Sequence, residues 1–156
     1  MPNHKTQRNT DLFSVMVSLY LVPSDEVVGF TAFNDIGYQP LAKDDIVLFQ
    51  GVRTNYGGYY EPTTSTFHCP VNGVYMFSSN VVSEINYSTR IDIMKNDVAQ
   101  IGILAYTADI STSAGGLCIT ECFVGETVWI KARYSGAMDG GSLGGTHFSG
   151  YLLTLI

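Results

Sequence analysis

Residues 49–79 read FQGVRTNYGGYYEPTTSTFHCPVNGVYMFSS, and this stretch decides the fold class. Its segment Asn55–Tyr60 is aromatic and contains two adjacent glycines, which indicates a loop. Further on, Pro70–Gly73 is a turn signal, and Gly73–Phe77 has the aromatic and β-branched residues typical of a strand. Just upstream, Ile46–Phe49 is a continuous apolar run, which predicts a strand covered on both faces. Short strands and turns therefore alternate within this one stretch.

The same alternation continues in both directions. Upstream, Val28, Phe30 and Ala32 alternate on one face of an expected strand. Downstream, Lys95–Asp97 is a hairpin signal, and Gly136–Gly145 is a glycine-rich loop. The further expected strands are Arg90–Met94, Val98–Leu104, Leu117–Val124, Val128–Tyr134 and Phe148–Ile156. Because these segments recur at a spacing of about ten residues with no amphipathic helix between them, the sequence predicts an all-β sandwich or barrel with antiparallel strands.

Composition limits the domain count and the class of partner. A chain of 156 residues, 46% hydrophobic and 14% charged, is long enough for one domain and too hydrophobic to be disordered. Its 8 basic and 14 acidic residues give a net charge of −6. Nucleic acid is therefore not an expected partner, because phosphate binding needs a surplus of Lys and Arg. We expect one domain over residues 25–156, preceded by a separate segment over residues 1–24.

The N-terminal segment allows two interpretations. An apolar run, Leu12–Val22, follows the basic residues Lys5 and Arg8 and precedes Pro23, which is the layout of a secretory signal. The run is too short to span a bilayer, so no membrane insertion is expected. No Ala-x-Ala-like cleavage site follows it, and the alternative is an extra strand or short helix packed on the domain.

The spacing of several residues resembles the signature of the globular domain of complement C1q. The matching positions are Phe49, Asn55, Tyr60, Phe67, Gly73, Tyr75 and Phe77. Ser79 departs from the pattern, since the family has Phe or Tyr there. Later landmarks also agree in order: Ile93–Asn96, Gly125–Trp129 and Phe148–Leu152. The resemblance covers residues 25–156 and is of the stalkless type found in invertebrates.

This resemblance implies a C1q/TNF-like jelly-roll sandwich of about ten antiparallel strands, assembled as a homotrimer and secreted to the extracellular space. The aromatic content, 10 Tyr, 8 Phe and one Trp, also favours an assembly, because aromatic residues are enriched at subunit interfaces. The interface candidates are Tyr59, Tyr60, Tyr75, Phe77, Tyr151 and Leu153. The alternative is that half of them belong to the ordinary core.

The sequence shows no motif typical of an active site. His4, His68 and His147 lie in no catalytic or metal-binding motif, so we expect no enzyme.

The three cysteines are an odd number, so at least one thiol is free. Cys118 and Cys122 would stand about 13 Å apart along one strand, too far for a bridge. The resemblance places core aliphatic residues there, which favours buried cysteines that act as small hydrophobes. The alternative is a bridge from Cys69 to one of the other two.

The resemblance further implies a lectin-like protein of innate immunity, a pattern-recognition trimer that binds microbial carbohydrate or lipopolysaccharide. Sugar binding needs flat aromatic rings with donors and acceptors. The candidates are Asp139, Tyr134, Ser142, Tyr56 and Tyr59, with Trp129 as a further ring whose position is also a structural landmark. Calcium is a candidate cofactor, with Asp97 and Asp139 as oxygen ligands. Asn86-Tyr-Ser88 is an acceptor for N-glycosylation.

Two other functions remain open from sequence. The chain could be a secreted trimeric ligand for a cell-surface receptor, as in cerebellin-like and adipokine-like relatives, or an acidic matrix protein that binds mineral.

Overall fold

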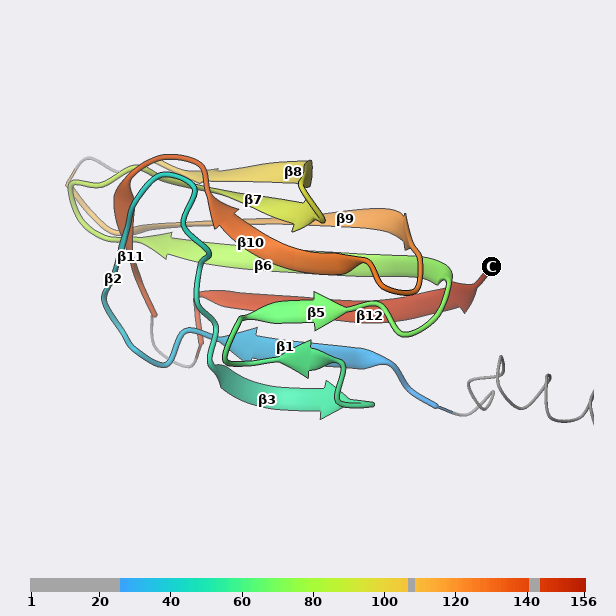
Figure 1. Ribbon diagram of the computed structural model, residues 1–156. Helices are drawn as coiled ribbons and strands as arrows, with labels where there is room; N and C mark the ends of the chain where they lie inside the picture. The colour runs from blue at the N-terminus through green and yellow to red at the C-terminus, as the bar shows by residue number, and fades with distance from the viewer. Residues whose placement is uncertain (1–25, 107–108, 141–143) are drawn as a thin grey trace, which may run out of the picture.

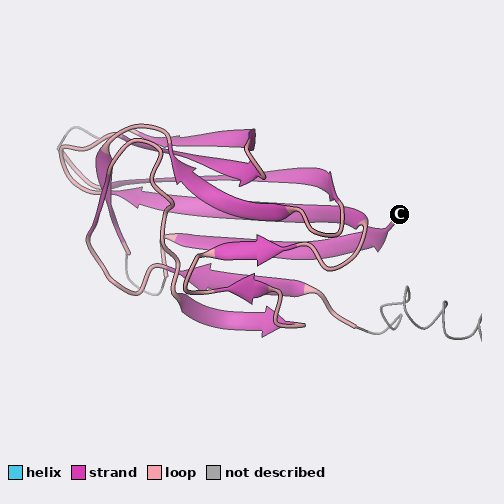
Figure 2. Cartoon of the chain, viewed as in Figure 1, coloured by secondary structure: helices cyan, strands magenta, loops and turns pink. Residues whose placement is uncertain are grey.

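The computed structural model describes residues 26–106, 109–140 and 144–156, and these residues form two antiparallel β-sheets (Figures 1 and 2). The all-β prediction is therefore confirmed. No helix among the described residues has the length and apolarity needed to cross a membrane. The predicted N-terminal segment, residues 1–24, lies outside the described residues.

The larger sheet contains seven strands. They are β1 (Gly29–Phe33), β2 (Gln39–Leu41), β3 (Gly51–Tyr56), β6 (Gly73–Ser83), β9 (Thr112–Cys122), β11 (Gly136–Asp139) and β12 (His147–Leu155). Their order is β2-β11-β6-β12-β1-β3. Strands β12 and β11 pair with successive parts of one edge of β6, and β9 pairs with its opposite edge. The long strand β6 alternates strictly between buried and half-buried residues, because one of its faces covers the core and the other is the outer surface of the sandwich.

The smaller sheet contains five strands in the order β4-β5-β10-β7-β8. They are β4 (Tyr60–Glu61), β5 (Thr66–His68), β7 (Thr89–Lys95), β8 (Val98–Ala105) and β10 (Thr127–Ala132). Strands β7 and β8 form the predicted hairpin. Asn96 has φ 50° in its turn, in the left-handed region that Asn tolerates better than most residues.

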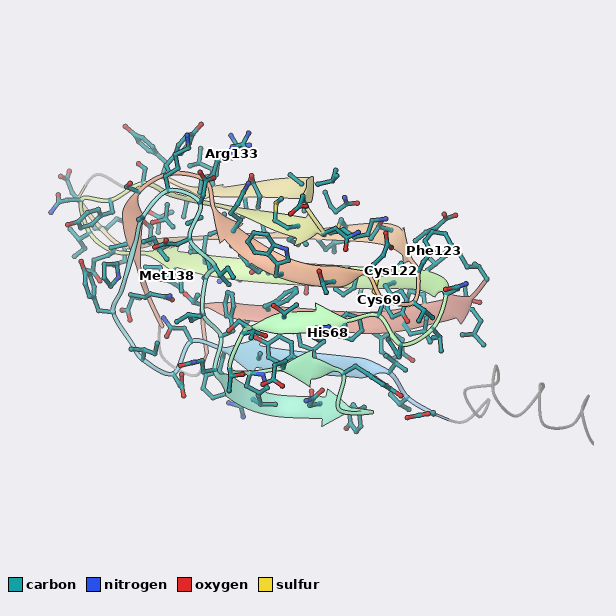
Figure 3. The ribbon with its side chains drawn as sticks, viewed as in Figure 1. His68, Cys69, Cys122, Phe123, Arg133 and Met138 are labelled. Atoms are coloured by element: carbon teal, nitrogen blue, oxygen red, sulfur yellow. A yellow bond between two sulfur atoms is a disulfide. The ribbon has the colours of Figure 1, made fainter. Side chains whose placement is uncertain are left out.

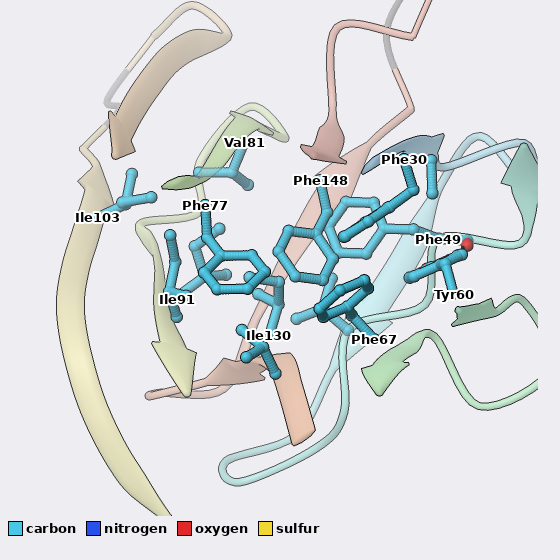
Figure 4. Close-up of a cluster of buried hydrophobic side chains, with 14 of the residues drawn as sticks. Phe30, Phe49, Tyr60, Phe67, Phe77, Val81, Ile91, Ile103, Ile130 and Phe148 are labelled. Atoms are coloured by element: carbon cyan, nitrogen blue, oxygen red, sulfur yellow. Dashed lines mark hydrogen bonds between the residues drawn. The ribbon is translucent and has the colours of Figure 1, made fainter. Parts of the chain in front are cut away.

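Aromatic rings from both sheets meet between them (Figure 4). The Phe30 ring of β1 stacks on Tyr60 of β4, with ring centroids 4.4 Å apart, and meets Phe148 of β12 edge-on at 4.9 Å. Phe67 of β5 lies edge-on against Phe77 of β6 at 5.5 Å. Such offset and edge-on pairs are the favoured arrangements of aromatic rings, and they fix how one sheet sits on the other.

Two landmark residues have a direct structural role in the loop between β3 and β4. The Asn55 side chain accepts a hydrogen bond from the Tyr60 backbone N–H (3.1 Å) and donates one to the Tyr60 carbonyl (2.9 Å). The loop is thereby closed across Gly57 and Gly58, which have φ of 81° and 74°. The buried Tyr60 hydroxyl in turn donates to the Phe49 carbonyl at 2.7 Å.

Cys69 and Cys122 form a disulfide, with Cα atoms 6.3 Å apart, while Cys118 is a free thiol (Figure 3). The favoured prediction, three buried reduced cysteines, is wrong, and the alternative is correct. Cys122 is the last residue of β9, and Cys69 lies just before β6, which pairs with β9 through Gly73 and Cys122. The end of one strand is therefore tied to the segment that leads into its neighbour.

Two further predictions differ from the structure. Ile46–Phe49 is not a strand: only Ile46 makes an isolated bridge, to Lys131, although Val47 and Phe49 are fully buried. The glycine-rich loop begins later than predicted, because Gly136–Asp139 is strand β11, paired with β2 and β6.

The described chain enters β1 and leaves β12 at the same end of the sandwich, as Figure 1 shows. We call this the terminal end. The opposite end, which we call the distal end, holds β2 and β11 together with the turns that leave β6, β8 and β10. The two ends carry different candidate surfaces.

Candidate recognition surfaces

Three tyrosines about half exposed lie at the distal end, and we call them the tyrosine surface: Tyr38, Tyr87 and Tyr134. Tyr38 precedes β2, Tyr87 lies in the turn between β6 and β7, and Tyr134 follows β10. Only Tyr134 was predicted as a ligand residue. Tyr38 and Tyr87 could not be inferred from local sequence, because the pairing of β2 with β11 brings them to one end.

Tyr134 is positioned by a charged cluster. The Arg90 guanidinium lies over its ring, 5.9 Å from the centroid. Arg90 Nε is 3.5 Å from Asp92 Oδ1, and Arg133 Nη1 is 3.4 Å from Asp92 Oδ2. Because Asp92 is buried, the two arginines that flank it are held at the surface next to Tyr134.

Tyr38 and Tyr87 are direct neighbours. Burial raises the pKa of the Tyr38 hydroxyl, and the adjacent Tyr87 hydroxyl and the Glu84 carboxylate raise it further. The Tyr87 backbone N–H donates to the Glu84 carbonyl at 3.0 Å, and this hydrogen bond closes the turn that carries Glu84 and Tyr87. Aromatic faces thus stand beside a carboxylate and hydroxyls, the mixture that sugar recognition requires.

Tyr56 and Tyr59, the other predicted sugar-binding rings, lie away from this surface. Tyr56 is the last residue of β3, whose arrow in Figure 1 points to the terminal end. The Tyr59 hydroxyl donates to Glu26 Oε1 at 3.3 Å, and burial followed by this carboxylate raises its pKa. The structure therefore does not bring the predicted aromatic residues into one site.

Asp139 and Asp97 also lie apart. Asp139 is half-buried in β11, where it pairs with Val82 of β6. Asp97 lies in the turn between β7 and β8, toward the terminal end, whereas β11 lies at the distal end (Figure 1). The two predicted calcium ligands are therefore not brought together within one chain, and Asp139 lies in a strand rather than in the predicted glycine-rich loop. Among the described residues, no three His, Cys, Asp or Glu side chains gather as metal ligands.

Two other predicted positions have clear outcomes. Ser142 lies outside the described residues. Trp129 is half-buried, and its Nε1 donates to the Asn96 carbonyl at 2.9 Å, so its indole holds the β7–β8 turn against β10. This agrees with the second interpretation of Trp129 from the sequence, that its position is a structural landmark of the fold.

Rows of outward-facing residues cross the larger sheet from β9 to β3. The first row, nearest the terminal end, holds Ile119, Met76, Tyr151, Gly29 and Tyr56. The second holds Leu117, Ser78, Ser149, Thr31 and Thr54. The third holds Gly115, Asn80, His147, Phe33 and Gly51. This face is therefore apolar toward the terminal end and more polar toward the distal end.

Two hollows open on this face. The first, of about 210 Å³, is lined by residues that include Gly29, Tyr56, Met76, Gly150 and Tyr151. The second, of about 290 Å³, is lined by Thr31, Phe33, Arg53, Gly144, His147 and Ser149.

The predicted interface residues divide into two groups. Tyr60, Tyr75 and Phe77 are at most 2% exposed and pack in the core, so the prediction that they contact a neighbouring chain is wrong. The alternation of residues along a strand does not show which face packs in the core and which face contacts another chain. Tyr151 and Leu153 of β12 are 48% and 45% exposed and remain candidates.

Comparison with known proteins identifies the family. The C1q domain model matches residues 29–153. A complement C1q subcomponent of Bos taurus is 30% identical over 126 residues, which cover 78% of this chain and 51% of the relative. Caprin-2 of Danio rerio is 28% identical over 130 residues, 81% of this chain and 14% of the relative. The chain thus spans about half or less of the length of these relatives.

Solved structures share the fold. The globular domain of zebrafish complement 1qA has a TM-score of 0.67 at 18% identity, covering 83% of this chain and 99% of that domain. Eiger TNF from S. frugiperda has a TM-score of 0.64 at 11% identity, covering 84% of this chain and 95% of that chain. The two packed sheets are thus the jelly roll of C1q and TNF-like domains, and with the matched signature over residues 29–153 the chain belongs to the C1q domain family.

Proposed function

We propose that this protein is a secreted, non-catalytic recognition protein of innate immunity, a lectin-like homotrimer that binds microbial carbohydrate or lipopolysaccharide. The observation that carries the proposal is the tyrosine surface at the distal end. Its three rings are each 43–52% exposed; the Arg90 guanidinium lies over the Tyr134 ring, and Tyr38 lies beside Tyr87 and Glu84. Rings offer flat apolar faces to a sugar, and the charged groups offer hydrogen bonds to its hydroxyls.

Secretion is supported by the disulfide, since disulfides form and persist mainly in oxidising compartments. Assembly is supported by the outer face of the larger sheet. It exposes Leu117, Ile119 and Tyr151 by 48–60% each, and monomeric soluble proteins rarely expose a large contiguous apolar patch.

A trimer would compensate for weak binding by each protomer. We expect millimolar affinity for a single sugar site, equivalent to about −4 kcal/mol. If the sheet faces meet, all three tyrosine surfaces lie at the same end of the trimer. A repetitive microbial surface then engages several of them at once, which raises the apparent affinity without any new contact.

The test is a glycan array combined with bacterial agglutination, each with and without a calcium chelator. Tyr134→Ala should abolish agglutination and array binding, while the thermal midpoint changes little because the ring is half exposed. Phe123→Ala is the matched control: it removes a 43% exposed ring from the turn after β9 at the terminal end (Figure 3), and it should leave both signals unchanged.

Equal agglutination by Tyr134→Ala and the unmodified protein would remove the tyrosine surface as the binding site. An empty array together with saturable binding to host cells would replace the lectin proposal with a trimeric receptor ligand. The measurements with chelator test whether binding depends on calcium, because a loss of binding on chelation requires a cation that the protein holds.

A further inference from the structure

The turn between β6 and β7 presents Asn86 at its apex. The hydrogen bond from the Tyr87 backbone N–H to the Glu84 carbonyl makes Ile85 and Asn86 the two central residues of a four-residue turn. Asn86 has φ 69°, a left-handed conformation that Gly and Asn adopt more readily than other residues. Its side chain is exposed, and within the described residues no hydrogen bond of this side chain is found.

The turn explains the asparagine but not the serine two residues later. Ser88 is half-buried just before β7, and its hydroxyl makes no hydrogen bond in the part of the chain that the structure describes. The two residues form the triplet Asn86-Tyr-Ser88, and the sequence contains no second Asn-x-Ser/Thr triplet. This triplet is the acceptor motif for N-linked glycosylation, which takes place at exposed loops of secreted proteins. The structure places the motif in such a loop.

The acceptor stays accessible in the proposed trimer. The subunit contact is assigned to the outer face of the larger sheet, where β6 contributes Met76, Ser78 and Asn80. Asn86 comes three residues after Ser83, the last residue of β6, where the chain turns toward β7 of the smaller sheet at the distal end (Figure 1). A group attached to Asn86 therefore lies at the distal end and not between subunits.

Asn86 is next to two of the three rings of the tyrosine surface. It directly precedes Tyr87, and the Tyr87 hydroxyl is the neighbour of the Tyr38 hydroxyl. The two rings are 43% and 52% exposed, so both have a face open to solvent. An N-linked glycan is bulky compared with a tyrosine ring, and one attached at Asn86 restricts access to both rings.

We propose that Asn86 carries an N-linked glycan that covers Tyr38 and Tyr87 and limits binding at the tyrosine surface. The reaction joins Asn86 Nδ2 to the anomeric carbon of an oligosaccharide carried on a lipid diphosphate. The bond from that carbon to the diphosphate oxygen breaks, the lipid diphosphate leaves, and the amide nitrogen releases one proton to solvent. The inference rests on the proposed secretion and carbohydrate function, and it adds a modification site and a regulation of the same surface.

The covalent attachment sets the size of the effect. A sugar held on a short flexible linker has an effective concentration of about 1 mM at a nearby site, similar to the millimolar dissociation constant expected for one protomer. The attached glycan then occupies the surface about half of the time, and the apparent affinity of each protomer for an added sugar falls about twofold. Three protomers that bind together multiply this loss to about eightfold.

The test compares the full chain secreted from eukaryotic cells with Ser88→Ala and Asn86→Gly made in the same cells. The unmodified protein should carry the mass of one glycan, which peptide N-glycosidase removes, and both variants should lack it. Asn86→Gly keeps the turn, because glycine adopts a positive φ without steric cost. Ser88→Thr is the matched control, because threonine preserves the acceptor motif. The two variants without glycan should agglutinate bacteria at about eightfold lower concentration than the unmodified protein and Ser88→Thr.

Hydroxyl-radical footprinting measures the cover itself and needs no ligand. Tyr38 and Tyr87 should be oxidised more slowly in the glycosylated protein than in Ser88→Ala. Phe123 is the internal reference, because its ring is as exposed as that of Tyr87, at 43%, and lies at the terminal end (Figure 3). It should be oxidised at the same rate in both proteins.

An unmodified protein secreted without a glycan would overturn the modification. Equal oxidation of Tyr38 and Tyr87 with and without the glycan would overturn the cover. Equal agglutination by the unmodified protein and Ser88→Ala would overturn the regulation and leave the lectin proposal standing. An empty glycan array for Ser88→Ala would instead refute the carbohydrate function, while the mass and the footprint still decide whether the glycan is present and covers the rings.

Discussion

Tyr75 combines ring packing and a hydrogen bond in one fully buried side chain. Its ring stacks against Phe77 at 5.8 Å, and its hydroxyl donates to the Val71 carbonyl at 2.9 Å. Burial raises the pKa of Tyr75 to about 12, and burial also raises the pKa of Tyr60. Both phenols therefore stay protonated in the folded chain at pH values at which an unfolded chain, with tyrosine pKa values of about 10, has begun to lose their protons.

This difference predicts a loss of stability at alkaline pH. The contribution of a group whose pKa is raised on folding is complete below its unfolded pKa, so the free energy of unfolding should be steady to about pH 10 and then fall toward pH 12. Tyr75→Phe should lower that free energy by about 1 kcal/mol at neutral pH, and it should make the alkaline decline shallower. Urea unfolding from pH 8 to 12, in a Cys118→Ala background to prevent thiol exchange, measures both effects.

Tyr106→Phe is the control for this prediction, because Tyr106 is 72% exposed and its loss should not change the slope. An alkaline decline of the same steepness in Tyr75→Phe would show that Tyr75 does not contribute to it.

At the scale of elements, the disulfide ties the segment between β5 and β6 to the end of β9 across 53 residues of sequence. Restricting a loop of this length in the unfolded chain is worth about 4 kcal/mol in the loop-entropy account. The double variant Cys69→Ala/Cys122→Ala should therefore unfold with a free energy lower by about this amount, as measured by urea denaturation.

Cys118→Ala is the control, since it removes the free thiol and leaves the bridge intact. Cys118 is half-buried in β9, and burial raises the pKa of its thiol, so it should react slowly with iodoacetamide until the chain unfolds. A double variant as stable as the unmodified chain would exclude a stabilising role for the bridge.

Local signals predicted some elements well and others poorly. The hairpin of β7 and β8 was predictable because its strands, turn and pairing all lie within residues 89–105. Strands β2 and β11 were missed because they are short, contain Pro40 and Gly136, and are strands only through pairing with each other across about a hundred residues of sequence. The same non-local pairing creates the tyrosine surface, so that site could not be predicted residue by residue.

A β-bulge at Arg53 is a second example. Strict alternation along β3 would place Arg53 on the opposite face from Val52 and Thr54, and only the paired register with β1 shows the extra residue. The aromatic landmarks were located correctly in sequence, yet their burial depends on which sheet face turns inward. Sequence could therefore give the family and the fold, and it could not give the surfaces.

At the scale of the whole molecule, the apolar rows of the larger sheet predict the assembly. Light scattering should give a mass of three times 17.0 kDa for the unmodified protein. Ile119→Asp places a charge on the first row, at a residue 60% exposed in the single chain, and should yield monomers that remain folded.

Val98→Asp is the matched control, because Val98 is 63% exposed on β8 of the other sheet. It should leave the trimer intact. A stable monomer of the unmodified protein at micromolar concentration would instead show that the outer face of the larger sheet is not a subunit interface.

The shared location of the start of β1 and the end of β12 has a practical consequence for biosensor design. A tag fused after Ile156 would anchor the protein to a chip by its terminal end, and the tyrosine surface would then point toward the flowing sample. Random coupling through lysine would lack this orientation, because the lysines of the described residues, Lys43, Lys95 and Lys131, lie in the loop after β2, in β7 and in β10. Immobilisation through the carboxyl terminus should therefore keep a larger active fraction on the chip.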